Sequence, residues 1–182
     1  RGRIATARAG NVIGGGDYGE DRIVPDCIRA LLAGTSIAVR NPAATRPWQH
    51  VLDCLSGYLW LGARLAEEET LADAFNFGPR PEAQRPVLEL VDTLLQHWPG
   101  EWTDASDPNA PHEAPTLSLN IDKAATVLNW MPVWDFAEAV QQTARWYQQR
   151  HEDESAAAAD LCRAQLEAYA AAASAQSCVW AR

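Results

Sequence analysis

The chain has 182 residues, of which 47% are hydrophobic and 21% are charged, and it carries a formal net charge of -9 at pH 7. This composition is that of a globular domain able to form a core. The negative charge argues against a nucleic-acid partner, because phosphate backbones are bound by clustered Lys and Arg. No apolar stretch approaches the ~20 residues of a membrane span, so we expect no membrane partner and a cytoplasmic location.

Metal-binding patterns are missing from the sequence. The four cysteines are widely spaced and form no C-x-x-C pair, which argues against a zinc knuckle or a redox dithiol. His112 and Glu113 are adjacent, but one His and one Glu without further spaced partners do not make a metal site. Lys123 is the only lysine among the 15 basic residues, and all the others are Arg, whose planar guanidinium suits bidentate recognition of phosphate.

The first part of the chain predicts a strand, a loop, a helix and a second strand. Residues 4–13 form a strand-like run that ends in a cluster of glycines. From Val24 onward apolar residues recur at helical spacing, with Pro25 suited to a first turn and Gly34 to a C-terminal stop, which predicts a helix of ~10 residues. Residues 37–40 are a short strand candidate.

Helices dominate the rest of the chain. Their expected starts are Asp53, Pro86, Asp122 and Asp135, and their expected ends lie near residues 66, 98, 129 and 150. The first of them is expected to have an apolar face that includes Leu55, Leu59 and Leu65. Residues 75–77 form a strand candidate that ends in a turn.

The alternation of strands and helices predicts an α/β fold with some parallel strand pairing. Few strands are visible and they are short, so we expect half of a sheet to be missing. Residues 1–154 are expected to form the main part of the fold and residues 155–182 an Ala-rich helical tail. In the tail, Leu161, Leu166 and Tyr169 recur at roughly helical spacing, which predicts a packed helix or a weakly held extension.

A glycine cluster, Gly14-Gly15-Gly16-Asp17-Tyr18-Gly19, formally matches the dinucleotide-binding pattern G-x-G-x-x-G. In a working fingerprint the third glycine lies in the opening turn of a helix whose free amides hold the pyrophosphate. Here Glu20 and Asp21 occupy that place, and Pro25 postpones the helix. We therefore interpret the cluster as a flexible loop whose backbone can approach a ligand closely.

Ordered motifs run through residues 1–150. They include Arg8-Ala9-Gly10-Asn11-Val12-Ile13-Gly14-Gly15-Gly16-Asp17, Asp21-Arg22-Ile23-Val24-Pro25, Arg40-Asn41-Pro42, Arg46-Pro47-Trp48-Gln49-His50-Val51, Phe75-Asn76-Phe77-Gly78-Pro79 and Leu128-Asn129-Trp130-Met131-Pro132. Together they resemble the CDP-glucose 4,6-dehydratases, which are extended short-chain dehydrogenases. R-N-P together with R-P-W-Q-H-V looks particular to the CDP-glucose enzymes. R-x-x-N-x-x-G, R-x-x-x-H-V and the late L-x-W-x-P are shared by extended short-chain dehydrogenases that act on nucleotide sugars.

The resemblance implies a two-part NAD-dependent lyase that converts CDP-glucose to CDP-4-dehydro-6-deoxyglucose. A Rossmann domain holds NAD, and a smaller C-terminal region closes over the nucleotide diphosphate. We expect this chain to be the C-terminal part: late Rossmann strands, the nucleotide-sugar-binding region and the helical tail. The family's Tyr-x-x-x-Lys pair is absent, because Lys123 follows Leu119 at that spacing. We therefore expect the chain to be inactive alone, to have the missing N-terminal Rossmann half as its partner, and to form a homo-oligomer when complete.

Site residues follow from the same resemblance. A diphosphate needs guanidinium forks, side-chain amides and backbone amides, and the Arg and Asn residues of the motifs supply them. The expected substrate-binding residues are Asn11, Arg22, Ile23, Val24, Pro25, Arg40, Arg46, Trp48, Asn76, His112 and Glu113. The expected cofactor-binding residues are Arg8, Gly10 and Asn11. His50 is expected to be a half-buried histidine with satisfied hydrogen bonds, and no catalytic role is assigned to it.

Three other readings stay open at this point. The chain could be a free-standing module that binds CDP-sugars without turnover, a truncated product with no stable fold, or part of a different nucleotide-sugar epimerase or dehydratase.

Overall fold

The computed structural model describes residues 3–109, 114–153, 155 and 157–181. Its strands are β1 (Thr6–Ala9), β2 (Asn11–Ile13), β3 (Ile37–Val39), β4 (Thr45–His50), β5 (Ala74–Phe77), β6 (Gln84–Pro86) and β7 (Trp102–Asp104). Its α-helices are α1 (Ile23–Ala33), α2 (Val51–Glu67), α3 (Val87–His97), α4 (Asp122–Leu128), α5 (Phe136–Glu152) and α6 (Ala158–Ala175), with the short 3-10 helices η1 (Glu69–Leu71), η2 (Pro81–Ala83) and η3 (Val179–Ala181). The predicted α/β class is confirmed.

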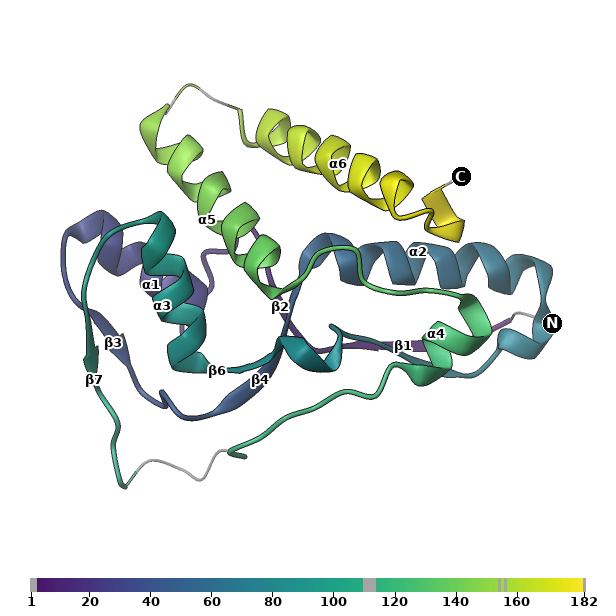
Figure 1. Cartoon of the computed structure of the whole chain (residues 1–182), viewed down its shortest axis with the longest axis horizontal. Helices are drawn as coiled ribbons and strands as arrows, with labels where there is room; N and C mark the ends of the chain where they lie inside the picture. The colour runs from purple at the N-terminus through teal and green to yellow at the C-terminus, as the bar shows by residue number, and fades with distance from the viewer. Residues whose placement is uncertain (1–2, 110–113, 154, 156, 182) are drawn as a thin grey trace.

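The strands form three small sheets (Figure 1). β1 pairs in parallel with β5, β2 pairs in parallel with β4, and β3 pairs in parallel with β7, while β6 adds an antiparallel edge to β4. The expected single run over residues 4–13 is divided at Gly10, where a Cβ would lie 2.9 Å from the carbonyl oxygen of Pro47. A glycine therefore lets the chain pass close to β4 as it leaves the first sheet for the second.

Two apolar clusters make up most of the core. One lies between the helices α1, α3 and α5 and the strands β2, β3 and β4, and it includes the buried Ile28, Val39 and Leu90. The other lies between β5, α2 and α4 and is centred on Phe77 and Trp130. The side chains that face these clusters come from the periodic apolar positions of the sequence, which is why the helices formed where expected.

The predicted boundaries of α1 and α5 are confirmed, whereas some predicted caps are wrong. Gly34 ends α1 with φ 63°, and the side chain of Asp135 accepts from the amide of Glu138 at the start of α5. α2 is capped by His50 and not by Asp53, because the ring of His50 accepts from the amide of Leu52.

The expected apolar face of α2 is confirmed only at Leu65, which packs against the cluster centred on Phe77 and Trp130. Leu55 and Leu59 point away from the described core, with 44% and 76% of their surface exposed, and Leu61 is the buried leucine of this helix. The apolar periodicity of α2 therefore continues on a side that no described element covers.

Two other predicted helix starts are also wrong. Pro86 precedes α3 instead of opening it, and Asp122 is the first residue of α4 and not its cap.

The Ala-rich tail forms a helix that packs on the main part of the fold. In the view of Figure 1, α6 follows α5 and lies above α2, and Tyr169 on α6 is buried against Trp134. The Tyr169 hydroxyl donates to Oδ1 of Asp53 at 2.8 Å, and Ser56 lies 3.0 Å from the same hydroxyl. The packed-helix reading of the tail is confirmed through Tyr169, whereas Leu166 is 52% exposed. No helix in the described ranges is long and apolar enough to cross a membrane.

Candidate functional site

A cavity of about 950 Å³ lies where β2, β4, the start of α1 and the end of β3 meet. Within residues 10–48 every predicted substrate-binding residue lines it, and its lining residues include Gly10, Asn11, Arg22, Ile23, Val24, Pro25, Arg40, Arg46 and Trp48. Its volume lies in the upper part of the range found for small-molecule sites. Segments far apart in the sequence are thus brought to one hollow.

The amino end of α1 forms one wall of the cavity. Arg22 precedes the helix and its side chain makes no capping hydrogen bond, while Ile23, Val24 and Pro25 follow along the cavity wall. The first amides of a helix have no partner within the helix, and the helix dipole places partial positive charge at this end. A helix start beside an arginine is suited to an anion such as a phosphate.

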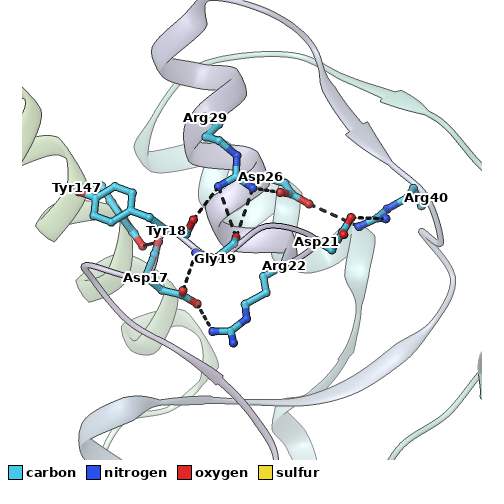
Figure 2. Close-up of polar contacts among 9 residues, drawn as sticks. All are labelled: Asp17, Tyr18, Gly19, Asp21, Arg22, Asp26, Arg29, Arg40 and Tyr147. Atoms are coloured by element: carbon cyan, nitrogen blue, oxygen red, sulfur yellow. Dashed lines mark hydrogen bonds and ion pairs between the residues drawn. The ribbon is translucent and has the colours of Figure 1, made fainter.

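Ion pairs connect the glycine loop, α1 and β3 around the cavity, and Figure 2 shows them. Arg22 Nη1 lies 3.0 Å from Oδ2 of Asp17, and Arg40 Nη1 lies 2.8 Å from Oδ1 of Asp21. Arg40 Nη2 also lies 3.6 Å from Oδ2 of Asp26. Burial would raise the pKa of Asp17, but the amide of Gly19 and the guanidinium of Arg22 outweigh it and lower that pKa.

The glycine loop is held in place by α5. A Cβ on Gly15 would lie 2.1 Å from Cγ of Trp146, and the hydroxyl of Tyr147 donates to the backbone carbonyl of Asp17. Arg29 adds hydrogen bonds to the carbonyls of Tyr18 and Gly19 (Figure 2). The glycine at position 15 is therefore explained by the close approach of Trp146, which agrees with the rejection of the dinucleotide fingerprint.

Arg46 and Trp48 project from β4 and are largely buried. Arg46 is 7% exposed, and its Nη1 donates to the carbonyls of Thr45 at 2.9 Å and Ala114 at 3.0 Å. The indole of Trp48 donates to the carbonyl of Arg85 at 3.0 Å. Arg46 is thus a guanidinium fixed in the cavity wall, whereas the guanidinium of Arg22 extends into solvent with 67% of its side chain exposed.

Other predicted site residues lie elsewhere. Asn76 on β5 and Arg8 on β1 are neighbours, with Arg8 Nη1 3.3 Å from Oδ1 of Asn76, and neither is among the residues that line the cavity. His112 and Glu113 lie outside the described residues. Within the described ranges no group of His, Cys, Asp and Glu side chains is placed to hold a metal ion.

Sequence reasoning missed part of the cavity. Its wall also includes the carboxylates of Asp17, Asp21, Asp26 and Asp107. Asp17 and Asp21 stand inside motifs that were singled out, so their position in those motifs was an available signal. Asp107 follows β7, and its place beside Arg40 depends on the pairing of β3 with β7, which no local pattern reveals.

Behind the cavity, two ionisable side chains at the start of α2 are fully buried. His50 and Asp53 each have 0% of their surface exposed. Burial lowers the pKa of His50 to about 4 and raises the pKa of Asp53 to about 6. Oδ1 of Asp53 accepts from the amide of Val133 at 2.6 Å as well as from Tyr169. His50 is more deeply buried than the predicted half-buried histidine and lies next to Trp134, with ring centroids 4.7 Å apart.

NAD was expected only in the full-length enzyme. Of the predicted cofactor residues, Gly10 and Asn11 line the cavity and Arg8 lies on β1, and their role toward NAD stays a prediction. Gly10 is explained by its contact with Pro47, and Arg8 is on an exposed strand. The glycine loop precedes α1 by several residues and packs on Trp146, so the described chain forms no glycine-rich turn into a helix of the kind that holds a dinucleotide.

No family model matches the chain. CDP-glucose 4,6-dehydratase of Salmonella typhimurium is 40% identical over 146 residues, which cover 79% of this chain and 41% of that enzyme.

Solved structures match the fold. UDP-glucuronic acid 4-epimerase from Bacillus cereus, in complex with UDP-glucuronic acid and NAD, superposes with a TM-score of 0.69 and 19% identity over 81% of this chain and 46% of its own. The dTDP-glucose 4,6-dehydratase from Bacillus anthracis, in complex with NAD, superposes with a TM-score of 0.67 and 18% identity. The match covers 82% of this chain and 46% of that enzyme. DesIV, a dTDP-glucose 4,6-dehydratase from Streptomyces venezuelae, superposes with a TM-score of 0.68 and 21% identity. The match covers 84% of this chain and 46% of DesIV.

The fold is that of the C-terminal part of extended short-chain dehydrogenases of the epimerase and dehydratase type. In sequence the chain is a relative of CDP-glucose 4,6-dehydratase. It spans less than half the length of the proteins that it matches. NAD is the cofactor in the solved relatives.

Proposed function

We propose that the cavity binds the nucleotide diphosphate of CDP-glucose, and that the chain provides this substrate site in an NAD-dependent CDP-glucose 4,6-dehydratase. The observation that carries the proposal is that the arginines and the helix start singled out by sequence gather around one cavity of suitable size. The 40% identity to a CDP-glucose 4,6-dehydratase gives the choice of nucleotide sugar.

The roles of the cavity residues follow from their positions. The start of α1 offers backbone amides to phosphate oxygens. Arg22 supplies an exposed guanidinium paired with Asp17, and Arg46 supplies a buried one held by the carbonyls of Thr45 and Ala114. Asn11 at the start of β2 contributes a side-chain amide, and the backbone from Ile23 to Pro25 frames the nucleotide. NAD, when bound in the complete enzyme, would accept and return the hydride.

The proposal assigns substrate binding to this chain and the redox step to a partner. The chain carries no Tyr-x-x-x-Lys pair, and the described residues form no dinucleotide fingerprint. We expect no turnover of CDP-glucose by the purified chain with added NAD, and turnover above that of a mock purification would contradict this. The partner is an N-terminal Rossmann half, and the complete enzyme is a homo-oligomer.

Titration of CDP and CDP-glucose against the purified chain by calorimetry tests the site. Arg22→Ala should weaken both ligands about ten- to a hundred-fold, because a charge-assisted hydrogen bond to phosphate contributes ~1.5 to 3 kcal/mol. Arg46→Ala should weaken them similarly, and Arg46→Lys should not fully restore binding because an ammonium cannot bind in bidentate fashion.

Two controls separate binding from folding. Arg163→Ala is the control for Arg22→Ala. It removes an arginine on α6 that is as exposed as Arg22, is paired with Asp160 and does not line the cavity, so both affinities should stay unchanged. Arg46 is buried and bonded to two carbonyls, so its variants also need a thermal melt, whereas Arg22 is exposed and its loss should not affect the fold. Unchanged affinity in Arg22→Ala and Arg46→Ala would refute the phosphate assignment.

A further inference from the structure

The cavity wall has more negative than positive side chains, which a diphosphate site does not require. The four carboxylates of Asp17, Asp21, Asp26 and Asp107 line it beside the guanidinium groups of Arg22, Arg40 and Arg46. Carboxylates repel phosphate, so those that remain in such a site need another role. Asp17 is accounted for, because it holds the loop through Gly19 and orients Arg22.

Asp21 is the least explained of these carboxylates. Its backbone has φ 59°, in the left-handed region that Asp and Asn adopt more readily than other non-glycine residues. Its side chain is 82% exposed, and Oδ1 accepts from Nη1 of Arg40 at 2.8 Å. Within the described residues Oδ2 of Asp21 has no hydrogen-bond partner. The loop therefore presents a carboxylate oxygen of Asp21 at the cavity as an acceptor.

Arg40 is fixed between two carboxylates. Nη1 contacts Asp21 from the glycine loop, and Nη2 lies 3.6 Å from Asp26 on α1 (Figure 2). Arg40 follows β3, and Ser106 and Asp107 follow β7, the strand paired with β3. This end of the cavity is therefore polar and carries an acceptor directly beside a guanidinium donor.

We infer that the Asp21–Arg40 pair reads the base of the nucleotide and selects cytosine. The inference depends on the proposed function: with the diphosphate at α1, Arg22 and Arg46, the base is left for the β3 end. Cytosine presents an amine donor at N4 beside an acceptor at N3, which matches a carboxylate beside a guanidinium. Uracil in the same orientation turns its O4 acceptor toward the carboxylate of Asp21 and is disfavoured.

The test is the ratio of the dissociation constants of UDP and CDP, measured by calorimetry on the purified chain. Wild type should prefer CDP by about ten-fold, the size of discrimination that one correct donor and acceptor pair gives between bases. Asp21→Asn should bring the ratio close to one, because an amide can turn to offer either an acceptor or a donor. Asn also tolerates the left-handed backbone, so the loop should keep its shape.

The matched control is Asp17→Asn, the same change in the same loop at the carboxylate that pairs with Arg22. It can alter the affinity of both nucleotides, but their ratio should stay that of wild type. Inorganic pyrophosphate reports on the phosphate end alone, and Asp21→Asn should not weaken its binding.

The outcomes separate this inference from the proposal beneath it. A wild type that binds neither nucleotide nor pyrophosphate overturns both. Equal affinity of wild type for CDP and UDP, or a change in Asp21→Asn that is the same for both nucleotides, overturns the reading of the base and leaves the diphosphate site standing. Loss of the preference in Asp21→Asn, with the ratio kept in Asp17→Asn, supports it.

Discussion

At the scale of single residues, the start of α2 holds two buried groups whose pKa values shift in opposite directions. The pKa of His50 falls to about 4 and the pKa of Asp53 rises to about 6, both through burial. In an unfolded chain the corresponding pKa values are about 6.5 and 3.9. Between about pH 4 and 6, unfolding therefore lets His50 take up a proton and makes Asp53 release one.

These two linkages oppose each other. The contribution of His50 to the free energy of unfolding rises with pH across this window, whereas the contribution of Asp53 falls with pH by a similar amount, on the order of 3 kcal/mol each. In wild type they should nearly cancel.

Single substitutions should separate the two contributions. We expect the stability of Asp53→Asn to rise relative to wild type as the pH goes from 4 to 6, because only the His50 linkage remains. His50→Asn, whose side chain can still accept from the amide of Leu52, should show a relative fall over the same range. Urea unfolding at half-unit pH steps measures both differences, and a constant offset from wild type in both variants would show that neither group has a shifted pKa.

At the scale of elements, the sequence predicted best where a local signal was decisive. The end of α1 follows from Gly34, which adopts φ 63°, and the start of α5 follows from Asp135. Asp53 carries the same cap signal but is drawn inward by the amide of Val133, 80 positions later. A tertiary partner decided against the local rule, and no local pattern could have shown it.

The residues that line the cavity could be predicted only in part, because local motifs reveal some of them and long-range strand pairing decides the others. Motif residues between Asn11 and Trp48 lie close in sequence to the loops that form the wall, and these were found. Asn76 was placed in the site by its motif, yet β5 pairs with β1 and carries it beside Arg8, away from the cavity lining. The pairing of β1 with β5, which are far apart in the sequence, therefore decides the position of Asn76.

The contact between the glycine loop and α5 can be tested with two glycine-to-alanine changes. Gly15→Ala should destabilise the chain by about 1 to 3 kcal/mol or more, because its methyl group would meet the indole of Trp146 at 2.1 Å. Gly62→Ala, on the exposed side of α2 with nothing within 4 Å, should stabilise it by about 0.5 to 1 kcal/mol. Thermal melts of both variants and of wild type measure these effects. A melting temperature of Gly15→Ala equal to that of wild type would mean that Trp146 can move aside freely.

At the scale of the whole molecule, an apolar surface remains beside an open sheet edge. β1 pairs only with β5 among the described strands and is mostly exposed, although strands of parallel sheets are usually buried on both faces. Leu55 and Leu59 are one helical turn apart on the exposed side of α2. An unpaired strand edge and an apolar helix face both favour association with other chains.

We expect the chain to self-associate or to bind a hydrophobic dye at micromolar concentration. Leu59→Glu should reduce both effects, because Leu59 is 76% exposed and its loss removes no described core contact. Leu166→Glu on α6 is the matched control, since Leu166 is also exposed but belongs to a different face. Analytical ultracentrifugation that shows a wild-type monomer, together with no dye binding, would contradict the expectation.

The attachment of the glycine loop to α5 has a consequence for biosynthesis. The backbone carbonyl of Asp17 accepts from the hydroxyl of Tyr147, which is made 130 positions later. Contacts of such separation form late, because a long segment must be ordered before they contribute. On the ribosome, the nascent glycine loop therefore lacks this support until α5 has emerged.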